Sequence, residues 1–90
     1  EIVCFISKQH YTSLFTESSS EYICGLSLNH LSQRLDPNHF VRLHRNSIVR
    51  TDAITAILSK NRMAVTLRNG LTLPVSRNHR KRVRGLFPNV

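Results

Sequence analysis

The sequence predicts a mainly β domain with one or two short helices. Short runs of β-branched, aromatic and aliphatic residues alternate with polar clusters that contain Gly, Pro, Asn, Asp and Ser, which is typical of strands joined by turns. Only two segments place apolar residues at the spacing of three and four that marks a helix, and both are short. A chain of 90 residues with 40% hydrophobic residues has enough apolar material for one modest core. We therefore expect a single domain over residues 1–90.

Three strands are expected in the first part of the chain, at residues 2–6, 11–16 and 22–26. The first is a continuous apolar run, as in a strand that is covered on both faces. The second is rich in β-branched and aromatic residues and is the expected antiparallel neighbour of the first. Gly25 inside the third run indicates a bulge.

A short helix is expected after the third strand. Ser27 offers an N-cap oxygen, and three leucines that follow share one helical face because they are spaced by three and four residues: Leu28, Leu31 and Leu35. Pro37 disfavours the helical region for Asp36 and so ends the helix. We expect this helix to cover one end of the sheet.

The rest of the prediction is organised around the central stretch, residues 40–50. Its sequence, FVRLHRNSIVR, is an extended apolar run that breaks at a polar, basic tip over residues 44–47 and resumes at Ile48. A tip held between two anchored strands can reach a partner without losing its geometry.

Three further runs, at residues 53–59, 62–68 and 71–75, predict an antiparallel meander. Lys60-Asn61 separates the first two runs, and Asn69-Gly70 separates the last two. Asn-Gly is the strongest short-range hairpin signal because both residues tolerate the positive φ angles of a type I′ turn. The side chains of the middle run alternate between two faces, and one face carries the residues expected to be buried: Met63, Val65 and Leu67.

The last segment, RNHRKRVRGLFPNV, predicts a basic helix that begins after an N-cap at Ser76. Its apolar side carries Val83, Leu86 and Phe87 at helical spacing. Gly85 and Pro88 limit its length. Its polar side carries five basic residues: Arg77, Arg80, Lys81, Arg82 and Arg84.

The charge of the chain is concentrated in one half. The net charge is +8 and the pI is near 10.8. Residues 1–36 carry two basic and four acidic residues, whereas residues 37–90 carry eleven basic residues and one acidic residue. Clustered Lys and Arg gain free energy by releasing the counterions condensed on phosphate, so nucleic acid is the first expected partner and an anionic membrane the second.

Several classes of protein do not fit this sequence. The apolar run at residues 2–6 is far shorter than the roughly 20 residues that span a bilayer, and no stretch of this sequence has the pattern of regions that marks a secretion signal. Cys4 and Cys24 lie alone in apolar strand patterns, without the spacing of a metal or redox motif, so we expect buried thiols in a reduced compartment. The sequence favours a cytoplasmic protein. We also expect the domain to be excised from a longer protein.

A candidate binding surface combines the loop around His10, the tip at Arg45-Asn46 and the segment from Arg77 to Arg84. Arginine can donate two hydrogen bonds to O6 and N7 of guanine in the major groove, so Arg45 and Arg77 are the base-contacting candidates. The remaining cations are better suited to backbone phosphates, which fix register without specifying sequence: Lys8, Arg80, Lys81, Arg82 and Arg84. The alternative is that these charges form only a solvated helix face.

Catalytic and metal sites are weak hypotheses here. His39 and His44 have a spacing similar to that of a zinc ligand pair, but no paired cysteines accompany them and an extended run would not converge both imidazoles on one ion. Ser76, His44 and Asp52 are the residue types of a Ser-His-Asp catalytic triad, but short chains often contain these types by chance. No glycines of a nucleophile elbow flank the serine. We expect no enzyme, no metal and no cofactor.

Five aromatic residues could stack on the bases of a single strand, namely Tyr11, Phe15, Tyr22, Phe40 and Phe87. All five lie within apolar patterns, so core packing is the expected role of most of them. Tyr11, beside the His10 loop, is the exception for which a stacking role stays open.

The order of these elements resembles the LytTR family of DNA-binding domains of bacterial transcription regulators. FVRLHRNSIVR is similar to the family's F-x-R-x-H-R-S-x-x-V-N signature at Phe40, Arg42, His44, Arg45 and Val49, with Asn46, Ser47 and Arg50 as departures. NGLTLPVSRNHRKRV is similar to the family's N/D-G-x-x-x-P-V-S-R ending, with matches at Gly70, Pro74, Val75, Ser76 and Arg77.

The resemblance implies an elongated arrangement of small antiparallel sheets whose loops enter successive major grooves. The base contacts implied are the loop of Gln9 to Tyr11, with His10, then Arg45 with Asn46, and Arg77 with Asn78. Binding to paired direct repeats in promoters is also implied, with two copies on the DNA and a bent duplex. An N-terminal receiver, sensor or membrane domain usually controls such a domain, as in the response regulators of two-component systems. The family normally has a strand or two before the position of Ile2.

The sequence leaves two other functions open. An RNA- or ribosome-binding module would use the same positive field. An interaction domain for an acidic protein partner, or for the protein's own sensor module, is the second alternative.

Overall fold

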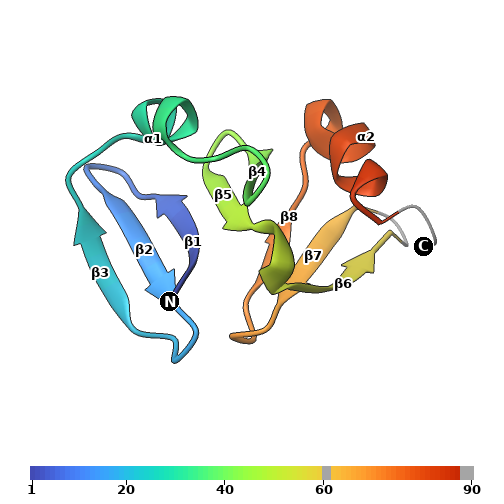
Figure 1. The fold of residues 1–90 in the computed structure, drawn as a ribbon, viewed down its shortest axis with the longest axis horizontal. Helices are drawn as coiled ribbons and strands as arrows, with labels where there is room; N and C mark the ends of the chain where they lie inside the picture. Colours follow the sequence, from blue (N-terminus) through green and yellow to red (C-terminus); the bar gives the residue numbers. More distant parts are fainter. Residues whose placement is uncertain (60–61, 88–90) are drawn as a thin grey trace.

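The structure is a computed structural model, and it describes residues 1–59 and 62–87 (Figure 1). It contains eight strands, two α-helices and one turn of 3₁₀-helix among these residues. In chain order they are β1 (Ile2–Ser7), β2 (Thr12–Thr16), β3 (Glu21–Cys24), α1 (Leu28–Arg34), β4 (Phe40–His44), β5 (Ser47–Arg50), η1 (Thr51–Ala53), β6 (Ile54–Leu58), β7 (Ala64–Leu67), β8 (Thr72–Pro74) and α2 (Arg77–Gly85).

The strands form two antiparallel sheets, as the sequence predicts. The larger sheet has the strand order β3-β2-β1-β5-β4, and the smaller sheet is the meander β6-β7-β8. Strands β1 and β2 are antiparallel neighbours, and the central stretch supplies the hairpin β4–β5. Strand β5 pairs with β1, with Cys4 opposite Val49, and this long-range pairing joins the central hairpin to the N-terminal strands. The meander is confirmed, although the predicted connection Lys60-Asn61 lies outside the described residues.

The large sheet is covered on both faces, which explains the continuous apolar run of β1. Phe5 and Ile48 point to the face that carries α1, where they pack with Leu28 and Leu31. Cys4 and Val49 point to the opposite face, where they join a second cluster with the small sheet and with Val83 of α2. The core is therefore two apolar layers on either side of one sheet.

The two cysteines differ in their surroundings. Cys4 is completely buried, and burial raises the pKa of its thiol to about 12, so this thiol is neutral at ordinary pH. Cys24 is only half-buried, at the end of β3, and the structure has no disulfide between the two. The prediction of buried thiols is confirmed for Cys4 alone.

Helix α1 follows the predicted pattern. The Oγ of Ser27 accepts a hydrogen bond from the backbone N–H of His30 at 3.2 Å, which confirms the N-cap. Leu28 and Leu31 are buried and Leu35 is half-buried. The helix lies on the face of the large sheet over β1 and β5, so the expectation that it covers the end of the sheet is wrong.

Within residues 1–59 and 62–87 the strand pairing has three bulge-type register shifts, and none of them is at the predicted position. Strand β3 ends at Cys24, so Gly25 follows the strand instead of interrupting it. Register shifts lie between Ile2 and Cys4, between Arg42 and His44, and between Ile54 and Ala56. A bulge inserts one residue and increases the local twist, so its position depends on how the sheet curves and is not fixed by a glycine.

The Asn69-Gly70 hairpin is confirmed, but its turn is not type I′. Gly70 has a φ of 93°, whereas Asn69 is not among the residues with positive φ. The N–H of Gly70 donates to the carbonyl of Leu67 at 2.9 Å, and Leu67 N–H donates to the carbonyl of Leu71 at 2.8 Å. These bonds define a three-residue loop with a left-handed glycine in third place. The Oδ1 of Asn69 accepts from Leu71 N–H, which a type I′ turn would not require.

We expect Gly70→Ala to lower the free energy of unfolding by about 1–2 kcal/mol, because an alanine side chain is strained at positive φ. Gly85→Ala is the matched control at the C-terminal end of α2, where an added Cβ meets no atom within 4 Å and φ is not positive. We expect this control to raise the free energy of unfolding by about 0.5–1 kcal/mol. Urea unfolding of both variants measures the difference, and two changes of the same sign would contradict it.

The aromatic residues divide into two groups. Phe15, Phe40 and Phe87 pack against the core, as expected. Tyr22 is 57% exposed, so its predicted core role is wrong. Tyr22 lies on β3, which is an edge strand of the large sheet and pairs with β2 alone among the strands that the structure describes. Tyr11 is 46% exposed in the β1–β2 loop.

Candidate nucleic-acid interface

The β4–β5 turn presents the two residues predicted for the central tip. Arg45 and Asn46 are exposed between the last residue of β4 and the first residue of β5. Neither residue has positive φ, so the turn is not one of the types that match the twist of a hairpin. The bulge between Arg42 and His44 accommodates this turn by adding twist to β4.

The guanidinium of Arg42 holds the backbone of this turn. Its Nε donates to the carbonyl of His44 at 2.9 Å, and its Nη2 donates to the carbonyl of Arg45 at 2.7 Å. Its Nη1 donates to Ser32 Oγ of α1 at 2.9 Å. His44 Nδ1 lies 3.3 Å from the backbone nitrogen of Asn46, which donates to it. The turn is thus fixed from within and is also attached to α1.

The β1–β2 loop lies beside this turn. The backbone N–H of Ser7 donates to the carbonyl of Asn46 at 2.8 Å, which places the start of the loop against the tip. Within the loop, Lys8 N–H donates to the carbonyl of Tyr11 at 2.7 Å. The side chains of Lys8, His10 and Tyr11 are exposed.

The junction of β8 and α2 lies on the other side of the central hairpin. The N–H of Ser76 donates to the carbonyl of Leu43 at 2.8 Å, so Arg77 and Asn78 begin the helix next to β4. Both side chains are exposed. Ser76 is the N-cap by position, but its hydroxyl bonds His79 Nδ1 at 2.7 Å instead of a backbone N–H of the first turn, which corrects the prediction of a side-chain cap.

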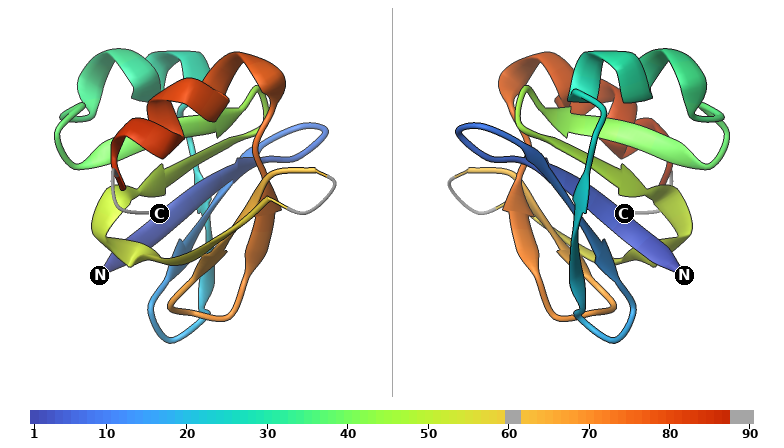
Figure 2. Two further views of the ribbon diagram at one scale, coloured as in Figure 1. Left: turned by 90° about the vertical axis from the view of Figure 1, so that its right-hand side faces the viewer. Right: turned by 90° about the vertical axis from the view of Figure 1, so that its left-hand side faces the viewer.

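The three predicted contact segments therefore lie on the same side of the molecule. Figure 2 shows the β1–β2 loop in blue, the β4–β5 turn in yellow-green and the start of α2 in orange, all projecting to that side. The two backbone hydrogen bonds, from Ser7 to Asn46 and from Ser76 to Leu43, hold the segments in sequence around the central turn.

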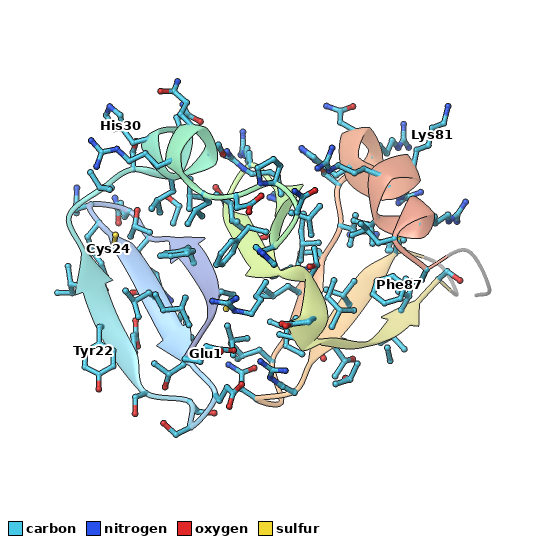
Figure 3. The ribbon with its side chains drawn as sticks, viewed as in Figure 1. Glu1, Tyr22, Cys24, His30, Lys81 and Phe87 are labelled. Carbon is cyan, nitrogen blue, oxygen red and sulfur yellow. The ribbon has the colours of Figure 1, made fainter. Side chains whose placement is uncertain are left out.

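The cations of α2 do not all have the same exposure. Lys81, Arg82 and Arg84 are exposed, and Lys81 projects from the upper edge of the molecule in Figure 3. Arg80 is half-buried, and its Nε is buried without a hydrogen-bond partner in the described residues. Val83 is buried and Leu86 is 38% exposed, so the apolar face of α2 is narrower than predicted.

The ion pairs and side-chain hydrogen bonds of the five acidic residues are made outside the three contact segments. Glu1, Glu17 and Asp52 surround Arg68, and Glu1 also pairs with Arg50. Glu21 accepts from Ser13, and Asp36 pairs with His39. Figure 3 shows Glu1 in the lower part of the molecule, whereas His30 of α1 and Lys81 of α2 lie at the upper edge. The basic side chains of the contact segments therefore have no carboxylate partner among the described residues, which favours a positive field on this side.

The family model of the LytTr DNA-binding domain matches residues 1–87. The chain belongs to the LytTR family. This match covers both sheets and both helices, so the resemblance drawn from the two motifs is confirmed, as is the mainly β fold with two short helices.

Two relatives illustrate the family. The chain is 31% identical over 81 residues to the CO-responsive transcriptional regulator RcoM of Rhodospirillum rubrum, an alignment that covers 87% of this chain and 34% of RcoM. The chain thus spans about a third of the length of that relative. Its structure is similar to a LytTr DNA-binding domain from a Bacillus cereus protein named as a methyl-accepting/DNA response regulator. The TM-score is 0.84 at 25% identity, over 94% of this chain and 79% of that one.

The other side chains considered from the sequence are engaged elsewhere in this LytTR domain. His39 pairs with Asp36, and His44 accepts from the backbone of Asn46, so these imidazoles have separate local partners. The hydroxyl of Ser76 bonds His79, while Asp52 lies beside Arg68 with the other acidic residues. Neither α-helix in residues 1–59 and 62–87 is long and apolar enough to cross a membrane.

Arg42 is the residue of this LytTR domain whose role was missed from the sequence. The motif match included it, but no role was assigned to it. A signal was present, because Arg42 shares a strand face with Phe40 and lies two residues before a polar turn. An arginine at such a position has backbone carbonyls within reach and few other ways to satisfy its donors.

His79 makes the stability of the LytTR domain depend on pH. Burial lowers the pKa of His79 below its usual value of 6.5, and the charges of Arg42 and His44 act in the same direction. The unfolded chain therefore binds this proton more readily than the folded one. The stabilisation is present above the unfolded value and is lost as the pH falls through the lowered folded pKa. We expect His79→Gln to show a shallower loss of stability below pH 6.5 in urea unfolding at a series of pH values. An unchanged slope would contradict this.

Proposed function

We propose that this chain binds double-stranded DNA in a sequence-specific manner, with loops entering successive major grooves. The observation that carries the proposal is the joining of three exposed segments on one side of the molecule by the bonds from Ser7 to Asn46 and from Ser76 to Leu43. The long dimension of the molecule is 36 Å, which is close to the roughly 34–36 Å of one turn of B-DNA. The position of the acidic residues elsewhere supports an anionic partner for this side.

Base contacts are proposed for residues at the three tips. Arg45 and Arg77 are suited to guanine, because each is exposed and has no carboxylate partner in the described part of the chain. The adjoining amides can contact adenine or phosphate. The full set is His10, Tyr11, Arg45, Asn46, Arg77 and Asn78.

Backbone phosphates are the proposed partners of Lys8, Arg80, Lys81, Arg82 and Arg84. If about five phosphates are neutralised, the logarithm of affinity should fall against the logarithm of salt concentration with a slope of about −4 to −5. Arg84→Ala should reduce the magnitude of this slope by about one and weaken binding to all duplexes by the same factor. Fluorescence anisotropy over a range of salt concentrations measures the slope, and a slope near zero would contradict an electrostatic interface.

The proposed setting is a transcription regulator that binds paired direct repeats in promoters, with two copies on a bent duplex. An N-terminal receiver, sensor or membrane domain is the proposed source of control, and residues 1–90 are the proposed DNA-binding unit. The length of RcoM, of which this chain spans 34%, supports an additional domain in the full protein.

The experiment is a selection of bound fragments from a random duplex library, followed by competition with single strands and structured RNA. We expect enrichment of one repeated site and displacement by its duplex alone. Preference for structured RNA would favour an RNA-binding module. Absence of salt-sensitive binding to any nucleic acid would favour an interaction domain for an acidic protein.

A further inference from the structure

A pocket lies between the two helices, on the α1 face of the large sheet. Figure 1 shows α1 and α2 at the same edge of the molecule with β4 and β5 between them. The pocket has a volume of about 260 Å³. Its lining comes from four elements and the α1–β4 connection: Ser32, Leu35, Pro37, Phe40, Arg42, Ile48 and Arg82.

The lining combines an apolar floor with two guanidinium groups. Phe40, Ile48 and Leu35 also belong to the apolar cluster beneath α1, so the floor continues the core to the surface. Arg42 and Arg82 supply the charge. Neither pairs with a carboxylate among the residues that the structure describes. Two cations at an apolar pocket favour a ligand that has one anionic group and an apolar body.

Arg42 is already oriented for such a ligand. Three of its N–H groups bind His44, Arg45 and Ser32, which fixes the plane of the guanidinium. A guanidinium has five N–H donors, so the remaining donors are available to a carboxylate without breaking these bonds. A fixed guanidinium loses little freedom on binding, which favours affinity.

We propose that this pocket binds a small carboxylate with a flat apolar body, held by Arg42 and Arg82 over Phe40. The size of the pocket sets the class of ligand, because pockets for drug-sized molecules are larger, at about 300–1,000 Å³. A carboxylate with one or two aromatic rings is therefore the appropriate class of ligand. The carboxylate of the ligand would touch Arg42, which holds the β4–β5 turn, so ligand binding would stabilise the turn. Coupling of this ligand to DNA binding rests on the proposed function, whereas the binding of the ligand itself does not.

The test is titration of the isotope-labelled chain with naphthoate, followed by amide chemical shifts and without any DNA. Two further probes separate the parts of the argument: naphthalenemethanol has the ring without the charge, and inorganic phosphate has the charge without the ring. With naphthoate we expect saturable chemical-shift changes at Ser32, Leu35 and Phe40. The other two probes should bind about tenfold or more weakly, because the alcohol lacks one charge-assisted hydrogen bond and phosphate lacks the buried ring.

Arg82→Gln and Lys81→Gln form a matched pair on neighbouring positions of α2. Each removes one positive charge, but only Arg82 lines the pocket, and Lys81 points away from the molecule in Figure 3. We expect Arg82→Gln to weaken the binding of naphthoate about tenfold. Lys81→Gln should weaken it by about twofold or less, because the charge of an exposed side chain outside the pocket is screened. The proposal is overturned by equal effects of the two variants, by equal binding of the alcohol or phosphate, or by shifts located elsewhere. Since no DNA is present, failure of the DNA-binding proposal leaves this result unaffected.

Discussion

We expect Arg77→Ala and Arg45→Ala each to weaken binding to the selected duplex by about 1–3 kcal/mol, the usual worth of a bidentate contact to guanine. Both side chains are exposed at the tips of rigid segments, and neither is held in an internal ion pair in the described structure. Because alanine removes both the fork and the charge, affinity for random duplexes should fall only by the smaller electrostatic amount. Fluorescence anisotropy with the two duplexes at one salt concentration measures the ratio.

Arg84→Ala is the control for these variants. It removes the same charge from an exposed position of α2, away from the three tips. Its effect should be the same on selected and random duplexes. If Arg45→Ala and Arg77→Ala behave like Arg84→Ala, their proposed contacts are to phosphate and not to bases.

Leu43→Ala should lower the free energy of unfolding by about 2–5 kcal/mol. Leu43 is completely buried on β4 and belongs to the cluster that joins the two sheets and α2. Its removal leaves a cavity at the point where the carbonyl of Leu43 also receives the N–H of Ser76. A small domain has a total stability of about 5–15 kcal/mol, so this loss is a large fraction of it. Urea unfolding of the variant gives the value.

Leu58→Ala is the matched control, since Leu58 lies on β6 and is 47% exposed. Its effect should stay within about 0.5 kcal/mol. Equal losses for the two variants would contradict the proposed core.

At a temperature where Leu43→Ala remains folded, we also expect this variant to have a reduced preference for the selected duplex, because the segments around Leu43 would no longer be held in register.

Local patterns predicted most elements of the fold because their causes are local. The alternation of Met63, Val65 and Leu67 correctly placed one face of β7 in the core, together with Met63 just before the strand. Ser27 with three spaced leucines correctly gave α1, because capping and helical spacing operate within one or two turns. The pairing of β1 with β5 was not predicted, since residues more than forty positions apart are brought together by the whole sheet. For the same reason Tyr22 was misplaced, because strand order decides which strand lies at the edge.

The candidate site was predicted as a list of residues and not as an arrangement. Charge and the two motifs selected Arg45 and Arg77, but only the bonds from Ser7 to Asn46 and from Ser76 to Leu43 bring their segments together. The place of Arg42 two residues before the turn was a signal for its bonds to the carbonyls of His44 and Arg45, but its bond to Ser32 of α1 depends on how the helix packs and has no signal in β4. The departure of Asn69 from a type I′ turn goes together with a hydrogen bond from the backbone N–H of Leu71 to its side chain. Such local competition between side chain and backbone is not visible in a two-residue signal.

The most direct measurement is a double-mutant cycle between Arg77 and guanine. In the selected duplex, each guanine is replaced in turn by a deazaguanine that carries C–H in place of N7, which removes a major-groove acceptor and leaves base pairing intact. We predict that one such replacement weakens DNA binding by the unmodified protein by about 1 kcal/mol or more. The same replacement should have little further effect on DNA binding by Arg77→Ala, since that variant has already lost the same hydrogen bond. Purely additive effects at every guanine would contradict the contact, and with it the account of arginines directed at base edges from a rigid β scaffold.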